Sequence, residues 1–323
     1  MPASRRALVR GAGLAAALFA LAACAAPGIT ARLEHDVAHV TIGGAPFASV
    51  HLAAQPRPYV FPILGPDGVM MTRSFPMAEV AGEERDHPHH QSLWFAHGSV
   101  NGFDFWVGKA HRERLEWNGV CDIDNEPTRC RLRCGYRWLA DGDTLVCTEE
   151  RELVFAGGDA RTIDVSVTLR PGSQPLVLGD TKEGTFALRV HPALCVESKT
   201  ATGKLVNSEG QQNRDVWGKK ARWIDDSGTV EGKQVGVAMF DHPANHGYPT
   251  WWHARTYGLL AANPFGVHDF EGKPAGTGNV TVPVGGRLTL RYRVLLHGSG
   301  WDQQRLEAAW QAWSTGQPAT PTQ

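Results

Sequence analysis

The segment RCRLRCGYRWLADGDTLVCTEERELVF, residues 129–155, decides the fold class. Apolar or aromatic residues alternate with polar ones on both sides of Asp141-Gly142, and this period of two is typical of half-buried β-strands. Gly142 can supply the positive φ that a tight turn between antiparallel strands requires. The segment therefore predicts a β-hairpin, with Trp138 in the core.

A similar pattern extends outward to residues 29–297. Short alternating runs are separated by turn residues, and the 323 residues include 36 Gly and 20 Pro, which is too turn-rich for a helical protein. Further strands are expected at residues 30–50, 58–73, 161–170, 186–190, 234–240, 256–262 and 287–297. We predict an all-β fold, a large antiparallel β-sandwich.

The C-terminal region has a different period. Leu306, Ala309, Trp310 and Trp313 recur at helical spacing, so residues 301–313 predict one amphipathic helix whose apolar stripe is core. Residues 317–323 are expected to form a disordered tail. No linker or change of composition divides the chain, so residues 24–316 are expected to form a single domain.

The N-terminal segment is typical of an export signal. Arg5, Arg6 and Arg10 flank an apolar run at residues 11–23 that is too short to span a bilayer. Residues 4–6 resemble a twin-arginine signal, and Leu-Ala-Ala-Cys resembles a lipobox, so we expect a signal peptide at residues 1–23 and lipidation of Cys24. The chain would then be exported and anchored by lipid to the cell envelope, facing the periplasm or the cell surface. The alternative is an ordinary signal peptide that contains a cysteine.

Charge and cysteine usage exclude some classes of partner. The chain has 32 Lys and Arg against 33 Asp and Glu, without a basic run, so no nucleic-acid partner is expected. Five cysteines follow Cys24, an odd number, so at least one is expected to be unpaired within the chain. Their spacing does not match a zinc site, and they are interpreted as structural or incidental.

Three segments concentrate polar and aromatic residues: 85–106, 179–184 and 240–266. The tripeptide Asp-His-Pro occurs in the first, at residues 86–88, and in the third, at residues 241–243. Nothing else in the two halves of the chain aligns. We therefore expect similar loops, which together line one site, rather than a duplicated domain.

The proline of the first tripeptide predicts an extended backbone at His87. In an extended segment, Asp86 is poorly placed to orient His87, and its carboxylate would instead reach a backbone N–H beyond the proline. His87 and His89 would share one face, and His90 would take the other.

The histidines of residues 85–106 permit three interpretations. His87 and His89, with His97 or a carboxylate as the third ligand, could hold a divalent metal such as zinc, iron or copper. Alternatively, His87, His90 or His97 could transfer protons without a cofactor, which is the interpretation we favour. The third interpretation is that they are structural histidines in a crowded loop. No cofactor is expected under the second and third interpretations.

The other two segments add candidate partners. Asp180 or Glu183 could be the partner base, with Lys182 beside them, although a solvated turn is the alternative. His253, Arg255 and Tyr257 alternate along one predicted strand and therefore share a face.

Eleven tryptophans, several of them within these segments, favour a sugar ligand, because flat rings stack on its C–H faces while polar groups bind its hydroxyls. No phosphate-binding loop, dinucleotide fingerprint or nucleophile elbow occurs. The expected partner is a small molecule or saccharide. The candidate ligand-binding residues are His89, Trp94, Asn101, Asp104, Trp106, Lys182, Asp241, His242, Asn245, Trp252, His253, Arg255, Tyr257 and Asn263.

Three ordered motifs, DHPHHQSLWFAHGSVNGFDFW, GDTKEGTFALRV and FDHPANHGYPTWWHARTYGLLAANPFG, resemble the bacterial PmoA-like family, which carries the label methane oxygenase PmoA. The resemblance covers nearly the whole mature chain. This chain has Gln91 where that family more often has Arg, and Ser99 where an acidic residue is frequent. The resemblance implies a carbohydrate context and a fold like that of galactose mutarotase relatives. A literal methane-oxidising membrane subunit conflicts with the turn-rich β pattern.

The leading hypothesis is a lipid-anchored carbohydrate-active or glycoside-active enzyme that uses histidine and carboxylate acid/base chemistry. A second hypothesis is a non-catalytic sugar-binding lipoprotein with Trp94 or Trp252 as its platform. A third is a metal-dependent oxygenase or lyase.

Overall fold

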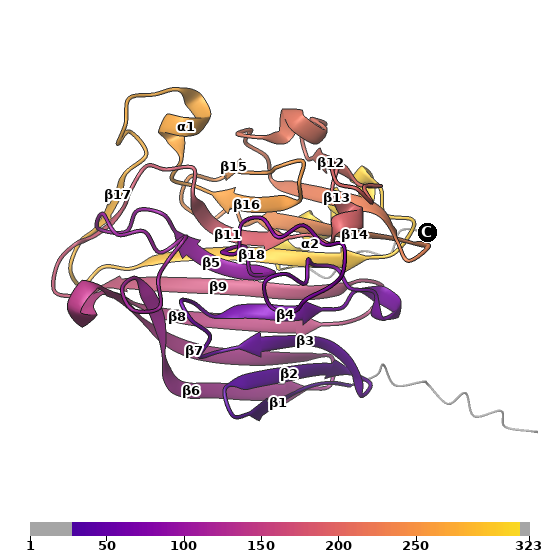
Figure 1. The fold of residues 1–323 in the computed structure, drawn as a ribbon, viewed down its shortest axis with the longest axis horizontal. Coiled ribbons are helices and arrows are strands. Elements are labelled where there is room, and N and C mark those ends of the chain that lie inside the picture. The colour runs from indigo at the N-terminus through magenta and orange to yellow at the C-terminus, as the bar shows by residue number, and fades with distance from the viewer. Residues whose placement is uncertain (1–27, 317–323) are drawn as a thin grey trace, which may run out of the picture.

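The computed structural model describes residues 28–316, in which two eight-stranded antiparallel sheets lie face to face (Figure 1). The first sheet has the order β1-β2-β3-β4-β5-β11-β16-β15. Its strands are β1 (Ile29–Glu34), β2 (Val37–Ile42), β3 (Ala45–His51), β4 (Tyr59–Ile63), β5 (Leu93–His97), β11 (Gly184–Arg189), β16 (Leu259–Asn263) and β15 (Trp251–Trp252). The all-β sandwich prediction is confirmed.

The second sheet has the order β12-β13-β14-β18-β9-β8-β7-β6. Its strands are β12 (Lys204–Asn207), β13 (Trp223–Val230), β14 (Lys233–Asp241), β18 (Leu288–His297), β9 (Arg161–Pro171), β8 (Thr144–Ala156), β7 (Arg129–Ala140) and β6 (Arg114–Glu126). A small third sheet pairs β10 (Leu176–Leu178) with β17 (Val280–Val282).

The predicted hairpin is present as β7 and β8. The strands join through a 3-10 turn at Asp141–Asp143, in which Gly142 has a φ of +65°. Alternate residues of β7 are buried, and Trp138 is among them, with its indole N–H donating to the Glu149 carboxylate at 2.8 Å. The alternation read from the sequence therefore gives the correct side of each strand.

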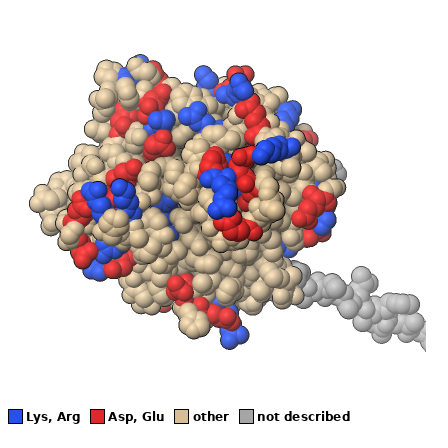
Figure 2. Space-filling model, in the orientation of Figure 1, with Lys and Arg blue, Asp and Glu red and all other residues tan. Residues whose placement is uncertain are grey.

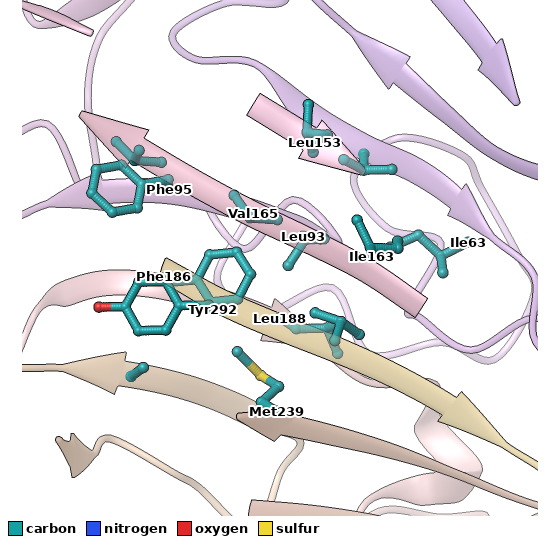
Figure 3. Packing of buried hydrophobic residues seen from close by; sticks show 14 of the residues in the cluster. Ile63, Leu93, Phe95, Leu153, Ile163, Val165, Phe186, Leu188, Met239 and Tyr292 are labelled. Atoms are coloured by element: carbon teal, nitrogen blue, oxygen red, sulfur yellow. The ribbon is translucent and has the colours of Figure 1, made fainter. Parts of the chain in front are cut away.

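The main core fills the space between the two sheets (Figure 3). Leu93 and Phe186 point inward from the first sheet, and Tyr292 and Met239 point inward from the second. The rings of Phe186 and Tyr292 stack with centroids 4.7 Å apart. Strand alternation then places Trp94 and Ala96 of β5, and Ala187 beside Phe186, on the opposite face.

The C-terminal helix is present as α2 (Gln303–Thr315), two residues later than predicted at each end. Asp302 caps it by accepting a hydrogen bond from the Arg305 N–H at 2.8 Å, and Gly316 ends it in the left-handed region. Leu306 is buried on the second sheet, and Trp310 and Trp313 pack beside it. A short helix, α1 (Val267–Glu271), was not predicted.

Several boundaries differ from the sequence prediction. The run at residues 30–50 forms three strands instead of one, and only residues 59–63 of the run at 58–73 form a strand. Strand β5 lies within the polar segment, where all five of its residues are buried. A strand buried on both faces shows no alternation, so the period-two pattern could not reveal it.

Charged side chains lie in small mixed groups on the face drawn in Figure 2. Within residues 28–316, no helix is both long and apolar enough to cross a membrane. The expected signal peptide, the lipidation site Cys24 and the tail at residues 317–323 lie outside the described residues.

Candidate functional site

The floor of the candidate site is the outer face of the first sheet, at β5, β11 and β16. Ala187 lies opposite Trp94 on one side and Ala261 on the other. Trp94, Ala187 and Ala261 belong to a small buried cluster that is separate from the main core, with Trp106 packed against them and Tyr257 at its edge. Loops before β5 and before β16 cover this floor with histidines.

The chain turns sharply at Pro88 instead of running extended. The N–H of His90 donates to the carbonyl of His87 at 2.9 Å, and His87 has a φ of +44°. Proline suits the second position of such a turn. The expected extended backbone at His87 is therefore wrong, because the turn and the contacts of Asp86 outweigh the local preference of a residue before proline.

The turn gathers the three histidines that an extended segment would have divided between two faces. The rings of His87 and His90 are 4.8 Å apart and nearly parallel, and His89 lies 4.5 Å from His90. The stack continues from His87 to Tyr257 at 5.1 Å and from His90 to Trp94 at 5.3 Å. Four aromatic rings thus form one stack, from the buried Trp94 through His90 and the partly exposed His87 to the partly buried Tyr257.

Asp86 organises this stack from the side. One carboxylate oxygen accepts hydrogen bonds from Arg73 and, at 3.0 Å, from Arg189, and the other lies 2.5 Å from Nδ1 of His87. Burial opposes ionisation of Asp86, but Arg189, His87 and Arg73 together hold its pKa below the ordinary value. The expectation that Asp86 cannot orient His87 is therefore wrong.

These contacts assign different roles to the three histidines. Nδ1 of His87 donates to Asp86, so its Nε2 is free to accept a proton. His90 accepts a hydrogen bond at Nδ1 from Arg189 at 3.1 Å, and burial lowers its pKa far below the ordinary value. Burial, followed by nearby Arg57, lowers the pKa of His89 to about 4. His87 is the histidine placed for proton transfer.

A second group borders the stack beside Tyr257. Nδ1 of His253 donates to the carbonyl of Lys182 at 2.8 Å, and Nε of Arg255 donates to Nε2 of His253 at 3.1 Å. Burial, followed by Arg255, lowers the pKa of His253 to about 3, so this imidazole is neutral. The hydrogen bond between Arg255 and His253 agrees with the prediction that their side chains share one face.

Glu183 lies on the Tyr257 side of the site. Its carboxylate is 3.4 Å from the Lys182 ammonium, and its side chain is 37% exposed. Burial raises the pKa of Tyr257; Glu183 and Asp86 both raise it further, while Arg189 lowers it. Tyr257 therefore lies within electrostatic reach of two carboxylates, Asp86 and Glu183.

Several buried polar atoms around this stack have no hydrogen-bond partner. Within the described residues they include the indole N–H groups of Trp94 and Trp106, Nε of Arg57, Nε of Arg189 and Oε1 of Gln91. Most buried polar groups are paired, and an unpaired one costs about 1–3 kcal/mol. Four of these five atoms are donors, so the site lacks acceptor oxygens.

Four residues expected in the site have structural contacts instead. His97 points toward the core, where Nε2 donates to the Gly179 carbonyl at 2.7 Å, and it is fully buried. Both oxygens of Asp180 accept backbone N–H groups, from His268 and Gly278. Asn101 is bonded to Pro175 and Val177, and Asp104 caps the N–H groups of Trp106 and Val107.

The second Asp-His-Pro lies in the second sheet, at the end of β14, and packs near α2. Asp241 accepts hydrogen bonds from Asn245 and from the Thr250 N–H, both at 2.8 Å, and burial raises its pKa to about 7. The ring of His242 meets Trp313 of α2 at 5.1 Å. The expectation that the two tripeptides line one site is not supported by these contacts.

Trp252 and Asn263 also have structural roles. Trp252 is fully buried in the main core and donates to the Ala221 carbonyl at 2.9 Å. Asn263 donates to the Thr181 carbonyl at 2.8 Å and accepts from the Phe265 N–H at 3.0 Å. Asn263 thereby fixes the 179–184 turn against β16 without reaching the stack.

The metal interpretation required His87 and His89 to meet a third ligand, either His97 or a carboxylate. His97 lies on the core side of β5, whereas His87 and His89 lie over the other face, so this ligand set is not assembled. Within residues 28–316, no group of three His, Cys, Asp or Glu side chains is placed to hold a metal ion.

Two surface hollows lie elsewhere. One, of about 440 Å³, crosses β6–β9 and includes Arg133 and Glu152, which pair with each other at 2.9 Å. The other, of about 320 Å³, includes Lys233 and Trp301. Neither contains a histidine, so we place the chemistry at the stack.

Sequence reasoning missed Arg57, Arg73 and Arg189. Each is a single basic residue in an otherwise apolar or turn-like run, and each is buried, which is rare for an arginine without partners. Arg73 and Arg189 pair with Asp86, and Arg57 donates to main-chain carbonyls. Arg189 lies within the predicted strand at 186–190 and ends β11, so an arginine inside a core strand was the available signal.

An antiparallel β-sandwich with a buried, arginine-supported histidine cluster on one outer face defines the class of protein. The chain belongs to a family of unknown function, DUF6807, whose model matches residues 38–311. This match corrects the resemblance to the PmoA-like family, because no family of methane oxygenases is matched. No curated protein matches the chain.

Two solved structures are similar in part. Heparan sulfate lyase HepC from Pedobacter heparinus has 8% identity and a TM-score of 0.40 over 86% of this chain, which spans only 36% of the lyase. A GalM/aldose epimerase homologue from C. elegans has 9% identity and a TM-score of 0.37, with 86% of this chain and 100% of the homologue covered. These scores are too low to transfer a function.

Proposed function

We propose that this protein is a carbohydrate-active enzyme that transfers a proton at a bound saccharide, with His87 as the general acid/base. The observation that carries the proposal is the pairing of Asp86 with His87, the partly exposed histidine of the ring stack. A base oriented by a carboxylate is a recurring arrangement for proton transfer.

The surroundings of His87 favour a saccharide. The flat faces of His87 and Tyr257 can stack on the C–H face of a sugar ring. HepC and the aldose epimerase homologue carry carbohydrate-related names, but the proposal depends on the contacts of this chain.

The chemistry can be assigned to individual groups. Nε2 of His87 takes a proton from the saccharide, and Asp86 stabilises the imidazolium that forms, since Nδ1–H already donates to it. Glu183, which follows the Lys182 carbonyl bound by His253, is the second acid/base, because the carboxylate oxygens of Asp180 are occupied by backbone N–H groups. The neutral His90 and His253 position their neighbours and do not titrate near neutral pH.

Two other hypotheses receive less support from the geometry. A binding protein with a tryptophan platform needs exposed indole faces, and Trp94 and Trp252 are 1% and 0% exposed. A metal-dependent oxygenase or lyase with the expected ligands needs His97 beside His87 and His89, which the position of His97 on the core side opposes.

The test is turnover of a panel of neutral and acidic oligosaccharides, with products detected by mass spectrometry. For a substrate that responds, His87→Gln should lower kcat by about 10²- to 10⁴-fold, the usual contribution of a general acid/base. Glu183→Gln should also lower kcat. The matched control is His242→Gln, which alters the other Asp-His-Pro and should leave kcat unchanged. Wild-type kcat in His87→Gln would show that the assignment is wrong.

We also propose that the chain is exported and anchored through a lipid on Cys24, on the evidence of the N-terminal sequence. The test is fractionation and mass analysis of the protein expressed in a bacterium that processes lipoproteins. Membrane association with acylated Cys24 is expected, and Cys24→Ala should release the protein. A chain that is found unmodified and membrane-free would contradict this proposal.

A further inference from the structure

Arg255 has an orientation that is built by its neighbours. Its Nε donates to Nε2 of His253 at 3.1 Å, and its guanidinium carbon lies 5.1 Å from the centre of the Trp217 ring. One edge of the guanidinium is therefore fixed by hydrogen bonding and one flat face by stacking. The two terminal nitrogens have no hydrogen-bond partner within the described part of the chain.

His253 can hold Arg255 only in its neutral form with the proton on Nδ1. The carbonyl of Lys182 selects that tautomer by accepting from Nδ1 at 2.8 Å, and Nε2 is left as an acceptor. His253 is 3% exposed, and its lowered pKa keeps it neutral. Lys182, His253 and Arg255 therefore form a fixed chain of hydrogen bonds that ends at the guanidinium.

The charge of Arg255 is not compensated by a carboxylate. Within residues 28–316, no Asp or Glu side chain lies within ion-pair distance of Arg255, while the nearby acids are paired elsewhere: Glu183 with Lys182, Glu197 with Arg214, and Asp86 with Arg73 and Arg189. A partly buried cation that is rigidly held without a counter-ion is typical of sites that bind an anion.

The position of Arg255 connects it to the proposed site. The N–H of Gly258 donates to the Arg255 carbonyl at 2.8 Å, so Arg255 and Tyr257 belong to one turn, and the Tyr257 ring stacks on His87 at 5.1 Å. The buried indole N–H of Trp217, which lies under the guanidinium, also lacks a hydrogen-bond partner.

We propose that the ligand is an acidic saccharide whose carboxylate or sulfate group binds Arg255, while its sugar ring stacks near His87 and Tyr257. This inference depends on the proposed function and narrows its substrate class. The planar fork of arginine matches a carboxylate or sulfate through two parallel hydrogen bonds, which a lysine cannot reproduce.

The experiment is calorimetric titration of the full chain with three oligosaccharides of equal length: a galacturonate oligomer, a sulfated galactan oligomer and a neutral galactan oligomer. We expect one of the two acidic probes to bind at least 10-fold more tightly than the neutral probe. Arg255→Gln and Arg255→Lys should each weaken that probe by about 10- to 100-fold, the range for hydrogen bonds to charged groups. The preferred probe identifies carboxylate or sulfate as the group that is bound.

The control variant is Arg214→Gln, since Arg214 is exposed and already paired with Glu197. It should leave the affinity for the acidic probe unchanged. If the neutral probe binds as tightly as both acidic probes, or Arg255→Gln binds as wild type does, this inference is overturned while the proposed function stands. If none of the three oligosaccharides binds, the inference is overturned, and the proposed function is then tested by the turnover panel of neutral and acidic oligosaccharides.

Discussion

Asp86 is the carboxylate on which the site depends, and replacing it by asparagine gives the most informative stability test. Its side chain is 37% exposed, while those of Arg73 and Arg189, which it pairs with, are 2% and 4% exposed. Asp86→Asn preserves the shape of the side chain and removes the charge that compensates two buried guanidinium groups.

The magnitude follows from the burial of the pair. Removing one partner of a fully buried ion pair costs about 3–5 kcal/mol, whereas an exposed pair is worth about 0–1 kcal/mol. Because Asp86 itself is partly exposed and solvent screens its charge, we expect Asp86→Asn to lower the free energy of unfolding by about 2 kcal/mol. Asp143→Asn is the control, since Asp143 is 75% exposed and pairs with Arg114 at the surface.

The same variant has a distinct pH dependence. The pKa of Asp86 is lowered in the folded protein, so the stability that it contributes is present above the ordinary carboxyl pKa and is lost as the pH falls through the lowered value. The difference between wild type and Asp86→Asn should therefore be largest at neutral pH and shrink on acidification.

The assay is urea unfolding followed by tryptophan fluorescence, from neutral pH down to about pH 3, where carboxyl groups titrate. The reasoning is refuted if Asp86→Asn is as stable as wild type at neutral pH. It is equally refuted if the difference between the two does not change as the pH falls.

Two further predictions concern the structure around the site and at the far end of the second sheet. Gly184→Ala should destabilise the protein by about 1–3 kcal/mol in urea unfolding, because the added Cβ would lie 2.4 Å from Nδ1 of the fully buried His97. The control is Gly298→Ala, which should be nearly neutral because nothing lies within 4 Å of the added Cβ. Equal effects of the two substitutions would contradict the packing around Gly184. The thiols of Cys121 and Cys134 lie directly opposite each other on β6 and β7 with their sulfurs 3.1 Å apart. Oxidised glutathione should therefore join them in a disulfide with release of reduced glutathione, and a peptide map without this link would contradict the register.

The fold was predictable where one face of a strand is buried and the other is exposed. In β7, alternate residues from Cys130 to Trp138 are buried, and the sequence alternates accordingly. Strand β5 has five buried residues, and its Trp94 and His97 resemble the flanking polar loop, so no local pattern distinguishes it. Its position depends on pairing with β4 and β11, which is a tertiary property.

The site was predictable only in part, because it also depends on which strands pair with one another. The histidines at 87, 89 and 90 and the group at 253–257 were identified from the density of polar residues. Arg73 and Arg189 lie 13 and 103 residues from Asp86 and could not be assigned to it without the sheet register. The repeated Asp-His-Pro was misleading, because Asp241 serves a buried turn beside α2.

The central claim is that the outer face of the first sheet, at the ring stack, binds the ligand. A crystal structure of the protein with whichever oligosaccharide responds in the titrations tests this claim most directly. We predict density for a sugar ring against His87 and Tyr257, with a ligand oxygen within hydrogen-bond distance of Nε2 of His87. Density at the hollow across β6–β9, or beside His242, with none at the stack would contradict the account.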